Sequence, residues 1–257
     1  MTRHESFAVT EISDKEMVLA TDLDGTFLGG TEQDRKDFYA WIENNRHRVG
    51  LIFVTGRDPG FIRETVRAGV PKPDYVIGDV GTTIAEFDHD GFVAPIAELE
   101  AEIAKAWGNA NAKVENALMK IKGLARQSSA FRYRVSYDLD AKEFDQEALD
   151  IVAQLGLDAL VSDNRFFDVL PKGVSKGPSL LRLLASLGIE NSRTLVAGDT
   201  LNDLSMLELG LPSVAVGGSE PGLVEKLQGQ QHVHCATGVG VSGIAEAILK
   251  HGLLTQA

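Results

Sequence analysis

Apolar runs of strand length alternate with segments of helical periodicity in the first and last thirds of this 257-residue chain, and this alternation constrains the fold most. The runs that we interpret as buried strands are residues 17–20, 49–55, 74–78, 193–199 and 213–217. Between them, one helical pattern begins near Glu32 and another begins at Pro59, behind the N-cap residue Asp58. Further helical patterns lie at residues 179–187, 204–209 and 244–249. The alternation predicts an α/β fold, with a parallel sheet flanked by helices.

The middle of the chain breaks this rhythm. Helical patterns cover residues 96–107, 114–122 and 145–155, and strand-like patterns cover residues 131–137, 157–161 and 166–170. Helices beside strands without βαβ order predict a small α+β domain inserted into the parallel one. We therefore expect residues 1–91 and 171–257 to form a catalytic core, and residues 92–170 to form an inserted α+β cap domain.

Composition excludes several classes of function. The formal net charge of −12 makes the surface repel nucleic acid and anionic lipid, and the sequence contains no basic patch large enough to reverse this. Cys235 is the single cysteine, so an intrachain disulfide is impossible and a reducing compartment is the simpler interpretation. The first residues lack the apolar region of a signal peptide, and no apolar run reaches the roughly 20 residues that span a bilayer. We expect a cytoplasmic protein with a small-molecule substrate and no nucleic-acid or membrane partner.

Two aspartates, Asp22 and Asp24, follow the first strand-like run, and Gly25 then allows a sharp turn. In open parallel sheets the site lies beyond the carboxyl ends of the strands, where this pattern places both residues. Side chains two apart leave an ideal strand on the same face, so the two carboxylates are expected to converge. A carboxylate can act as nucleophile, metal ligand or general acid/base, and a pair can divide these roles.

Three other polar stretches occupy comparable positions, just after a strand or at the start of a helix. Together with residues 22–26 they are residues 55–57 (Thr-Gly-Arg), 175–177 (Ser-Lys-Gly) and 198–203 (Gly-Asp-Thr-Leu-Asn-Asp). Each one alone is consistent with an ordinary turn, a solvated lysine or a helix N-cap. In this order they resemble the four motifs of the haloacid dehalogenase (HAD) superfamily, and the resemblance covers nearly the whole chain.

A narrower resemblance is carried by residues 73–82, 132–140 and 167–171, the last followed closely by Ser-Lys-Gly. These segments are similar to those of the sucrose-phosphate phosphatase group, which has an inserted cap of the C2B (type IIB) class. The resemblance implies an Mg²⁺-dependent phosphatase with a HAD-like Rossmannoid core.

The resemblance also assigns roles at the metal site. It implies that Asp22 is the nucleophile and a metal ligand, and that Asp199 supplies a second carboxylate. It gives Asp24 a metal ligand in its backbone carbonyl, and places Asp203 at the metal or at a water bound to it. A phosphate monoester carries about two negative charges, so an attacking carboxylate needs a cation such as Mg²⁺ nearby.

The remaining core roles concern the phosphate and the proton. The resemblance implies that Thr55, Gly56 and Lys176 hold the phosphoryl oxygens, and that Asn202 orients the loop or donates to phosphate. The Asp24 side chain is expected to protonate the leaving oxygen and then to activate water. This role needs a raised pKa, which burial and nearby carboxylates can supply.

Substrate choice is expected to lie in the cap and in the loop around Thr82. In an ideal strand over residues 131–138, Arg132 and Arg134 share a polar face, opposite an apolar face. This polar face either roofs the site and contacts sugar hydroxyls, or it is a solvated face of an antiparallel sheet.

The leading hypothesis is hydrolysis of a disaccharide or glycoside phosphate, such as sucrose 6-phosphate, through a phosphoaspartate intermediate. One alternative is a sugar phosphomutase similar to phosphomannomutases, which needs a basic cluster for a second phosphate. The candidates for that cluster are Arg126, Arg132, Arg134 and Lys172. The other alternative is a non-catalytic sugar-phosphate-binding protein.

Overall fold

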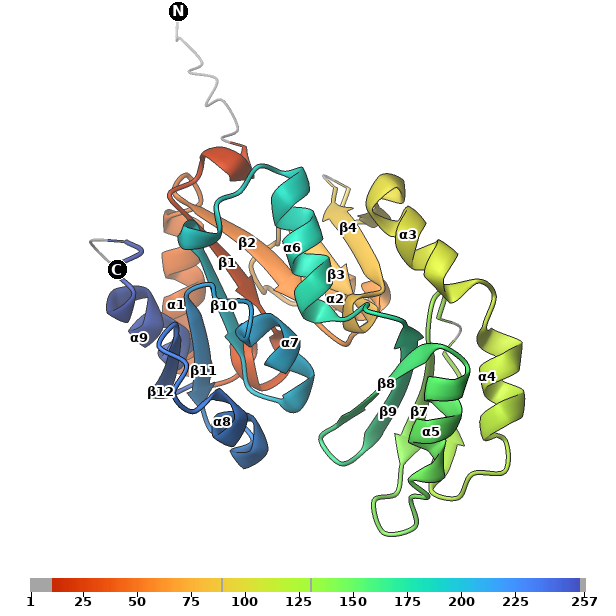
Figure 1. Ribbon diagram of the computed structural model, residues 1–257. Helices are drawn as coiled ribbons and strands as arrows, with labels where there is room; N and C mark the ends of the chain where they lie inside the picture. Colours follow the sequence, from red (N-terminus) through yellow and green to blue (C-terminus); the bar gives the residue numbers. More distant parts are fainter. Residues whose placement is uncertain (1–10, 89, 130, 255–257) are drawn as a thin grey trace, which may run out of the picture.

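The computed structural model describes residues 11–88, 90–129 and 131–254. Residues 1–10, on which the expectation about a signal peptide rests, lie outside these ranges. Within them, the chain forms an eight-stranded sheet, called here the large sheet, and a four-stranded sheet, called the small sheet. Figure 1 shows the small sheet and its helices as a separate lobe beside the large sheet.

The large sheet has the order β12-β11-β10-β1-β2-β3-β4-β5. Its strands are β1 (Met17–Thr21), β2 (Val49–Val54), β3 (Tyr75–Gly78), β4 (Thr83–Phe87), β5 (Val93–Pro95), β10 (Thr194–Gly198), β11 (Ser213–Gly217) and β12 (Val233–Val239). Neighbouring strands are parallel from β12 to β3, whereas β4 and β5 are antiparallel additions at one edge. The α/β fold expected from the sequence is therefore confirmed, with a sheet that is mixed at its β4–β5 edge.

Helices cover both faces of the large sheet (Figure 1). One face packs against α1 (Glu32–Asn44), α2 (Pro59–Arg67) and α9 (Val241–Lys250), and the other against α6 (Lys176–Ser186), α7 (Leu204–Leu207) and α8 (Pro221–Leu227). The strands are buried on both faces, so successive residues of β1 such as Met17 and Val18 enter opposite cores. None of the described helices is both long and apolar enough to cross a membrane.

The small sheet has the order β6-β7-β9-β8 and is antiparallel throughout. It contains β6 (Leu124–Arg126), β7 (Val135–Leu139), β8 (Leu157–Ser162) and β9 (Phe166–Pro171), and α4 (Asn111–Leu118) and α5 (Glu147–Gln154) pack on one face. The helix α3 (Ala97–Trp107) joins the two lobes, because Ile103 packs into the core of the large sheet and Trp107 into that of the small sheet.

Two sequence expectations change in detail. Strand β5 lies inside the range assigned to the cap, yet it pairs with β4, so we propose that the inserted domain begins near α3 instead of at residue 92. The strand expected from residue 131 begins only at Val135. Before this strand, Arg132 reaches Glu100 on α3 and Arg134 reaches the Gly56 carbonyl in the core.

Candidate active site

The order of the large sheet brings the predicted site residues to one edge. Strands β10, β1 and β2 are neighbours, and Asp199, Asp22 and Thr55 each follow the carboxyl end of one of them. Connections on either side of β1 run in opposite directions along the sheet, which opens a crevice at these strand ends. The site is therefore a consequence of the strand order.

The turn after β1 fixes how the first aspartates point. Gly25 has φ of +79°, and a Cβ there would lie 2.2 Å from Asp199 Oδ2, so only glycine fits. The Thr26 hydroxyl donates to Asp199 Oδ1 at 2.6 Å. The turn and the loop after β10 are thereby held against each other.

Lys176, the first residue of α6, is the positive centre of the site. Its Nζ donates to Asp22 Oδ1 at 2.6 Å, to Asp203 Oδ1 at 2.6 Å and to Asn202 Oδ1 at 2.8 Å. The side chain is fully buried. Burial alone would lower the pKa of Lys176, but the Asp203 and Asp22 carboxylates outweigh it and raise the pKa, so the ammonium keeps its charge.

Three aspartates, Asp22, Asp199 and Asp203, form what we call the acidic cluster. Each offers a carboxylate oxygen, and these atoms lie within 4.8 Å of one another. The backbone N–H groups of Asp199 and Thr200 donate to Asp203 Oδ2 at 2.9 and 3.0 Å, which orients that carboxylate. Three carboxylates around one lysine leave excess negative charge, and close-set oxygen ligands suit a hard cation such as Mg²⁺.

The pKa values of Asp22 and Asp199 reflect their burial and the charges around them. Burial raises the pKa of Asp22 well above its usual range, with Lys176 opposing the shift and Asp203 and Asp199 adding to it. Burial, followed by the Asp203 charge, raises the pKa of Asp199 to about 7. Asp22 and Asp199 therefore keep their protons to a higher pH than isolated aspartates do.

The Asp24 side chain lies in a different environment from the one that the sequence suggested. Its side chain is 51% exposed, and Arg57 Nε and Nη2 donate to its two carboxylate oxygens at 2.8 and 2.9 Å. Strand β1 ends at Thr21, so the same-face rule does not apply beyond it, and the two carboxylates meet different cations. The expected convergence of Asp22 and Asp24 side chains, and the burial of Asp24, are not found.

The turn at residues 55–57, called here the phosphate turn, follows β2. Thr55 is buried, and its hydroxyl oxygen accepts a hydrogen bond from the Arg57 N–H at 3.1 Å. Sequence reasoning gave no role to the Arg57 side chain or to Asp79, whose N–H donates to the Arg57 carbonyl at 3.1 Å. Arg57 lies next but one to the motif residue Thr55, and Asp79 lies within residues 73–82, which carry the narrower resemblance, so both had a signal in the sequence.

The three predicted substrate residues make contacts within the chain. Arg132 donates to both Glu100 oxygens, at 2.8 and 2.9 Å, and the Thr82 hydroxyl donates to the Asp79 carbonyl at 3.0 Å. Arg134 is buried among core and cap groups, so the solvated-face alternative is wrong for this side chain. A role of these residues in substrate binding stays a prediction.

A cavity of about 360 Å³ lies between the small sheet and the loops that carry the site. Asp158 and Leu160 of β8 line it from one side, and Ser175, Leu201 and Asn202 line it from the other. Because Asn202 bonds Lys176, this space adjoins the acidic cluster. Its volume is that of a small-molecule pocket.

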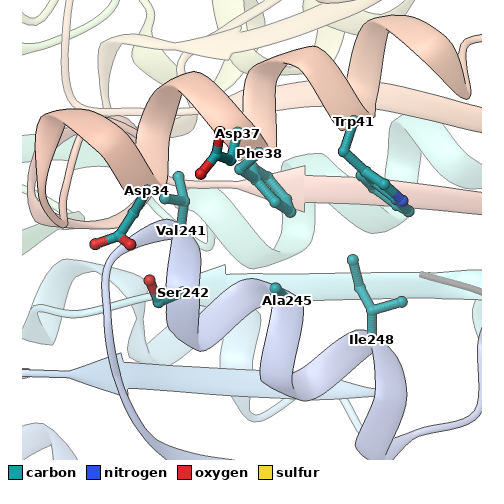
Figure 2. Close-up of a pocket in the computed structure, with 8 residues that line it drawn as sticks. All are labelled: Asp34, Asp37, Phe38, Trp41, Val241, Ser242, Ala245 and Ile248. Carbon is teal, nitrogen blue, oxygen red and sulfur yellow. The ribbon is translucent and has the colours of Figure 1, made fainter.

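A separate groove of about 270 Å³ runs between α1 and α9 (Figure 2). The Phe38 and Trp41 rings are stacked 5.6 Å apart and form much of its apolar lining, with Asp34 and Asp37 on the same helix. An apolar floor beside two carboxylates opposes phosphate binding, and none of the residues described above lines it. This groove is therefore separate from the acidic cluster and from Lys176.

The chain is similar in sequence to known proteins. The family model of sucrose-6F-phosphate phosphohydrolases matches residues 15–252. A glucosylglycerol-phosphate synthase of Pseudomonas anguilliseptica is 39% identical over 93% of this chain, which spans only 31% of that relative's length. A mannosylfructose-phosphate phosphatase of Agrobacterium fabrum is 30% identical over 92% of this chain and 97% of its own.

Solved structures show the same fold. A sucrose-phosphatase from Synechocystis, solved with sucrose and phosphate, superposes with a TM-score of 0.82 at 24% identity, covering 93% of this chain and 98% of its own. A haloacid dehalogenase-like hydrolase from Bacillus subtilis gives a TM-score of 0.68 at 16% identity, over 96% of this chain and 95% of its own.

Proposed function

We propose, since the chain belongs to the sucrose-6F-phosphate phosphohydrolase family of HAD phosphatases, that it hydrolyses a disaccharide or glycoside phosphate with the help of Mg²⁺. The observation that carries this proposal is the convergence of Asp22, Asp199 and Asp203 around Lys176. A dianionic phosphate is repelled by carboxylates unless cations stand beside them. The Lys176 ammonium supplies one positive charge where the phosphate has to bind.

The acidic cluster fits a bound Mg²⁺. Its oxygens are close enough to share one ion, and burial, with the neighbouring carboxylates adding to it, raises the pKa of Asp22 and Asp199. Asp22, Asp199 and Asp203 would hold the ion, together with the Asp24 backbone carbonyl that the family resemblance implies. When bound, Mg²⁺ supplies charge neutralisation for the phosphoryl oxygens.

The chain's own residues then divide the chemistry. An Asp22 oxygen attacks phosphorus, the ester P–O bond breaks, and a protonated Asp24 gives its proton to the leaving sugar oxygen. Asp24 is paired with Arg57 in this structure, so it has to leave that pair and take up a proton before this step. In the second step Asp24 takes a proton from the water that attacks phosphorus, which frees phosphate and restores Asp22. Lys176 and Thr55 hold phosphoryl oxygens throughout, and Asn202 orients the Lys176 ammonium.

The leaving sugar is proposed to occupy the cavity between the small sheet and the core. Its volume of about 360 Å³ falls within the roughly 300–1,000 Å³ range of small-molecule pockets. The polar groups of Asp158, Ser175 and Asn202 on its wall can bond sugar hydroxyls. The names of the relatives suggest sucrose, mannosylfructose and glucosylglycerol phosphates as candidate substrates.

A phosphomutase is less well supported, because its cap must present free cations to a second phosphate. The four basic candidates are already paired with carboxylates: Arg126 with Glu115, Arg132 with Glu100, Arg134 with Asp168, and Lys172 with Asp158. A requirement for a sugar bisphosphate activator would favour the mutase.

The test is release of inorganic phosphate from a panel of sugar monophosphates and disaccharide phosphates, with Mg²⁺ and then with EDTA. We expect Mg²⁺-dependent release, fastest with one disaccharide or glycoside phosphate. Slow hydrolysis of every ester would keep the reaction and reject the proposed substrate class. No release from any ester would leave a sugar-phosphate-binding protein as the better interpretation.

Mg²⁺ affinity is expected to increase about tenfold between pH 6 and pH 8. The ion binds the carboxylate form, and Asp199, with a pKa of about 7, is mostly protonated at pH 6 and mostly ionised at pH 8. Calorimetric titration of the metal-free protein at both pH values measures the change. The Asp199→Asn variant, which has no proton to lose there, should show a weaker dependence. Equal affinities of the unaltered protein at pH 6 and 8 contradict the prediction.

A further inference from the structure

A short buried segment, residues 79–81, lies between two parts of the active site. Asp79, Val80 and Gly81 have φ of +52°, +58° and +98°. The left-handed region is unfavourable for a β-branched residue, so the surroundings must hold Val80 there. The segment is therefore a rigid element whose position depends on its contacts.

Those contacts lead to both phosphate-binding motifs. The Val80 N–H donates to the Thr55 carbonyl at 3.2 Å, and the Asp79 N–H donates to the Arg57 carbonyl, so the segment is bonded to the phosphate turn. On its other side, the Ser179 hydroxyl of α6 donates to the Gly81 carbonyl at 2.6 Å. A Cβ on Gly81 would lie 2.4 Å from the Ser175 carbonyl, beside Lys176.

One side chain of the inserted domain reaches into this assembly. Arg134 precedes β7 and is 5% exposed. Its Nη2 donates to the Gly56 carbonyl at 3.0 Å and lies 3.4 Å from Asp79 Oδ1, while its Nη1 donates to Asp168 Oδ1 on β9 at 2.9 Å. The Phe131 ring covers the guanidinium, 3.7 Å away.

We propose that Arg134 is a positioning residue: with Asp79 and Asp168 it ties the inserted domain to the phosphate turn, so that the turn has its catalytic geometry only when this domain is docked. The proposal rests on the proposed function for its kinetic consequence. Arg57 follows Gly56 in the chain and donates two hydrogen bonds to the Asp24 carboxylate, so Asp24 is also connected to the phosphate turn. Docking of the inserted domain therefore places Thr55 and Asp24 together.

The alternative that Arg134 contacts the sugar is less consistent with its surroundings. Its charge is already matched by two buried carboxylates and one carbonyl, and Asp79 is further held by the Thr83 hydroxyl at 2.6 Å. Turning Arg134 toward a ligand would leave Asp79 and Asp168 buried without their cation, which costs several kcal/mol. A planar five-donor group is suited to such a bridge, and a lysine cannot span the same acceptors.

The test compares Arg134→Met, Arg134→Lys and Asp79→Asn with the unaltered protein, on the preferred sugar phosphate and on p-nitrophenyl phosphate. We expect kcat to fall about 10- to 100-fold on both esters, because a displaced phosphate turn affects phosphoryl transfer from any leaving group. The double variant Arg134→Met/Asp79→Asn should have a kcat no lower than that of the less active single variant, because both substitutions break the same linkage. Arg126→Met is the matched control, since its ion pair with Glu115 lies wholly within the inserted domain.

A second readout does not need turnover. Calorimetry with inorganic phosphate and Mg²⁺ should show binding weakened about tenfold in Arg134→Met and unchanged in Arg126→Met. All assays are run well below the unfolding midpoint of each variant. If Arg134→Met does not fold, the nearly isosteric substitution Asp79→Asn tests the same linkage. An increase in KM for the sugar phosphate alone, with p-nitrophenyl phosphate unaffected, would overturn the proposal in favour of substrate contact. Unchanged kinetics and phosphate binding would reduce Arg134 to a packing role.

Discussion

The Asp22→Asn variant is expected to fold normally and to lose at least about a thousandfold in kcat, as removal of a catalytic nucleophile generally does. Asparagine keeps an oxygen that can accept the hydrogen bond from Lys176 Nζ, so the 2.6 Å contact can persist. It also removes one of three clustered negative charges, which relieves repulsion with Asp199 and Asp203. Loss of turnover should therefore occur without loss of structure.

Phosphate release and thermal unfolding, measured on the same preparation, separate the two effects. Asp37→Asn is the matched control, because Asp37 lies on α1, where Gln33 donates to its side chain, away from the acidic cluster. We expect the control to hydrolyse the substrate at the normal rate. Hydrolysis by Asp22→Asn at a comparable rate would show that Asp22 is not the nucleophile.

The Lys176→Met variant is expected to lose both activity and stability. Three oxygen acceptors then lose their only donor among the contacts described, and two of them are buried carboxylates. Breaking a buried ion pair by removing one partner costs about 3–5 kcal/mol. For a chain of this size that corresponds to a fall in the unfolding midpoint of about 6–20 °C.

Mg²⁺ is expected to restore part of the lost stability, because a bound cation supplies the positive charge that the variant lacks. Thermal unfolding with and without Mg²⁺ measures this, and a second substitution, Asp203→Asn, should also recover stability by removing an unmatched charge. The control is Lys172→Met: Lys172 pairs with Asp158, but its side chain is 74% exposed, and surface pairs contribute little. If Lys176→Met were as stable as the control, Lys176 would not be needed to compensate the negative charge of the acidic cluster.

Both expected results depend on the charges that are buried together at this site. The protein holds three carboxylates around one ammonium, and burial together with the neighbouring carboxylates raises the pKa of Asp22 and Asp199. One ammonium does not balance three carboxylates, so we expect the site to attract a divalent cation. A cation held there would be available to phosphoryl oxygens.

The parallel part of the fold was predictable because its signals are local. Apolar runs bounded by glycine and by capping residues predicted β1, β2, β3, β10 and β11, and Asp58 and Pro59 predicted the start of α2 correctly. The short strands β4, β5 and β6 were missed. Strand β4 contains Glu86, and β5 and β6 have only three residues each, so none of them presents the apolar run that marked the other strands.

The sequence by itself determined which chemistry the chain can hold, because the four motifs each follow a strand or begin a helix, and parallel strands bring such positions together. Only the tertiary structure decided which charged side chains form ion pairs and hydrogen bonds with one another. The Arg57–Asp24 pair joins residues 33 apart, and Arg134 meets Asp79 and Gly56 across 55 and 78 positions. Strand ends are set by local hydrophobic patterns, whereas an ion pair forms only where the packing of distant elements places a donor within about 3 Å of an acceptor and removes the competing water.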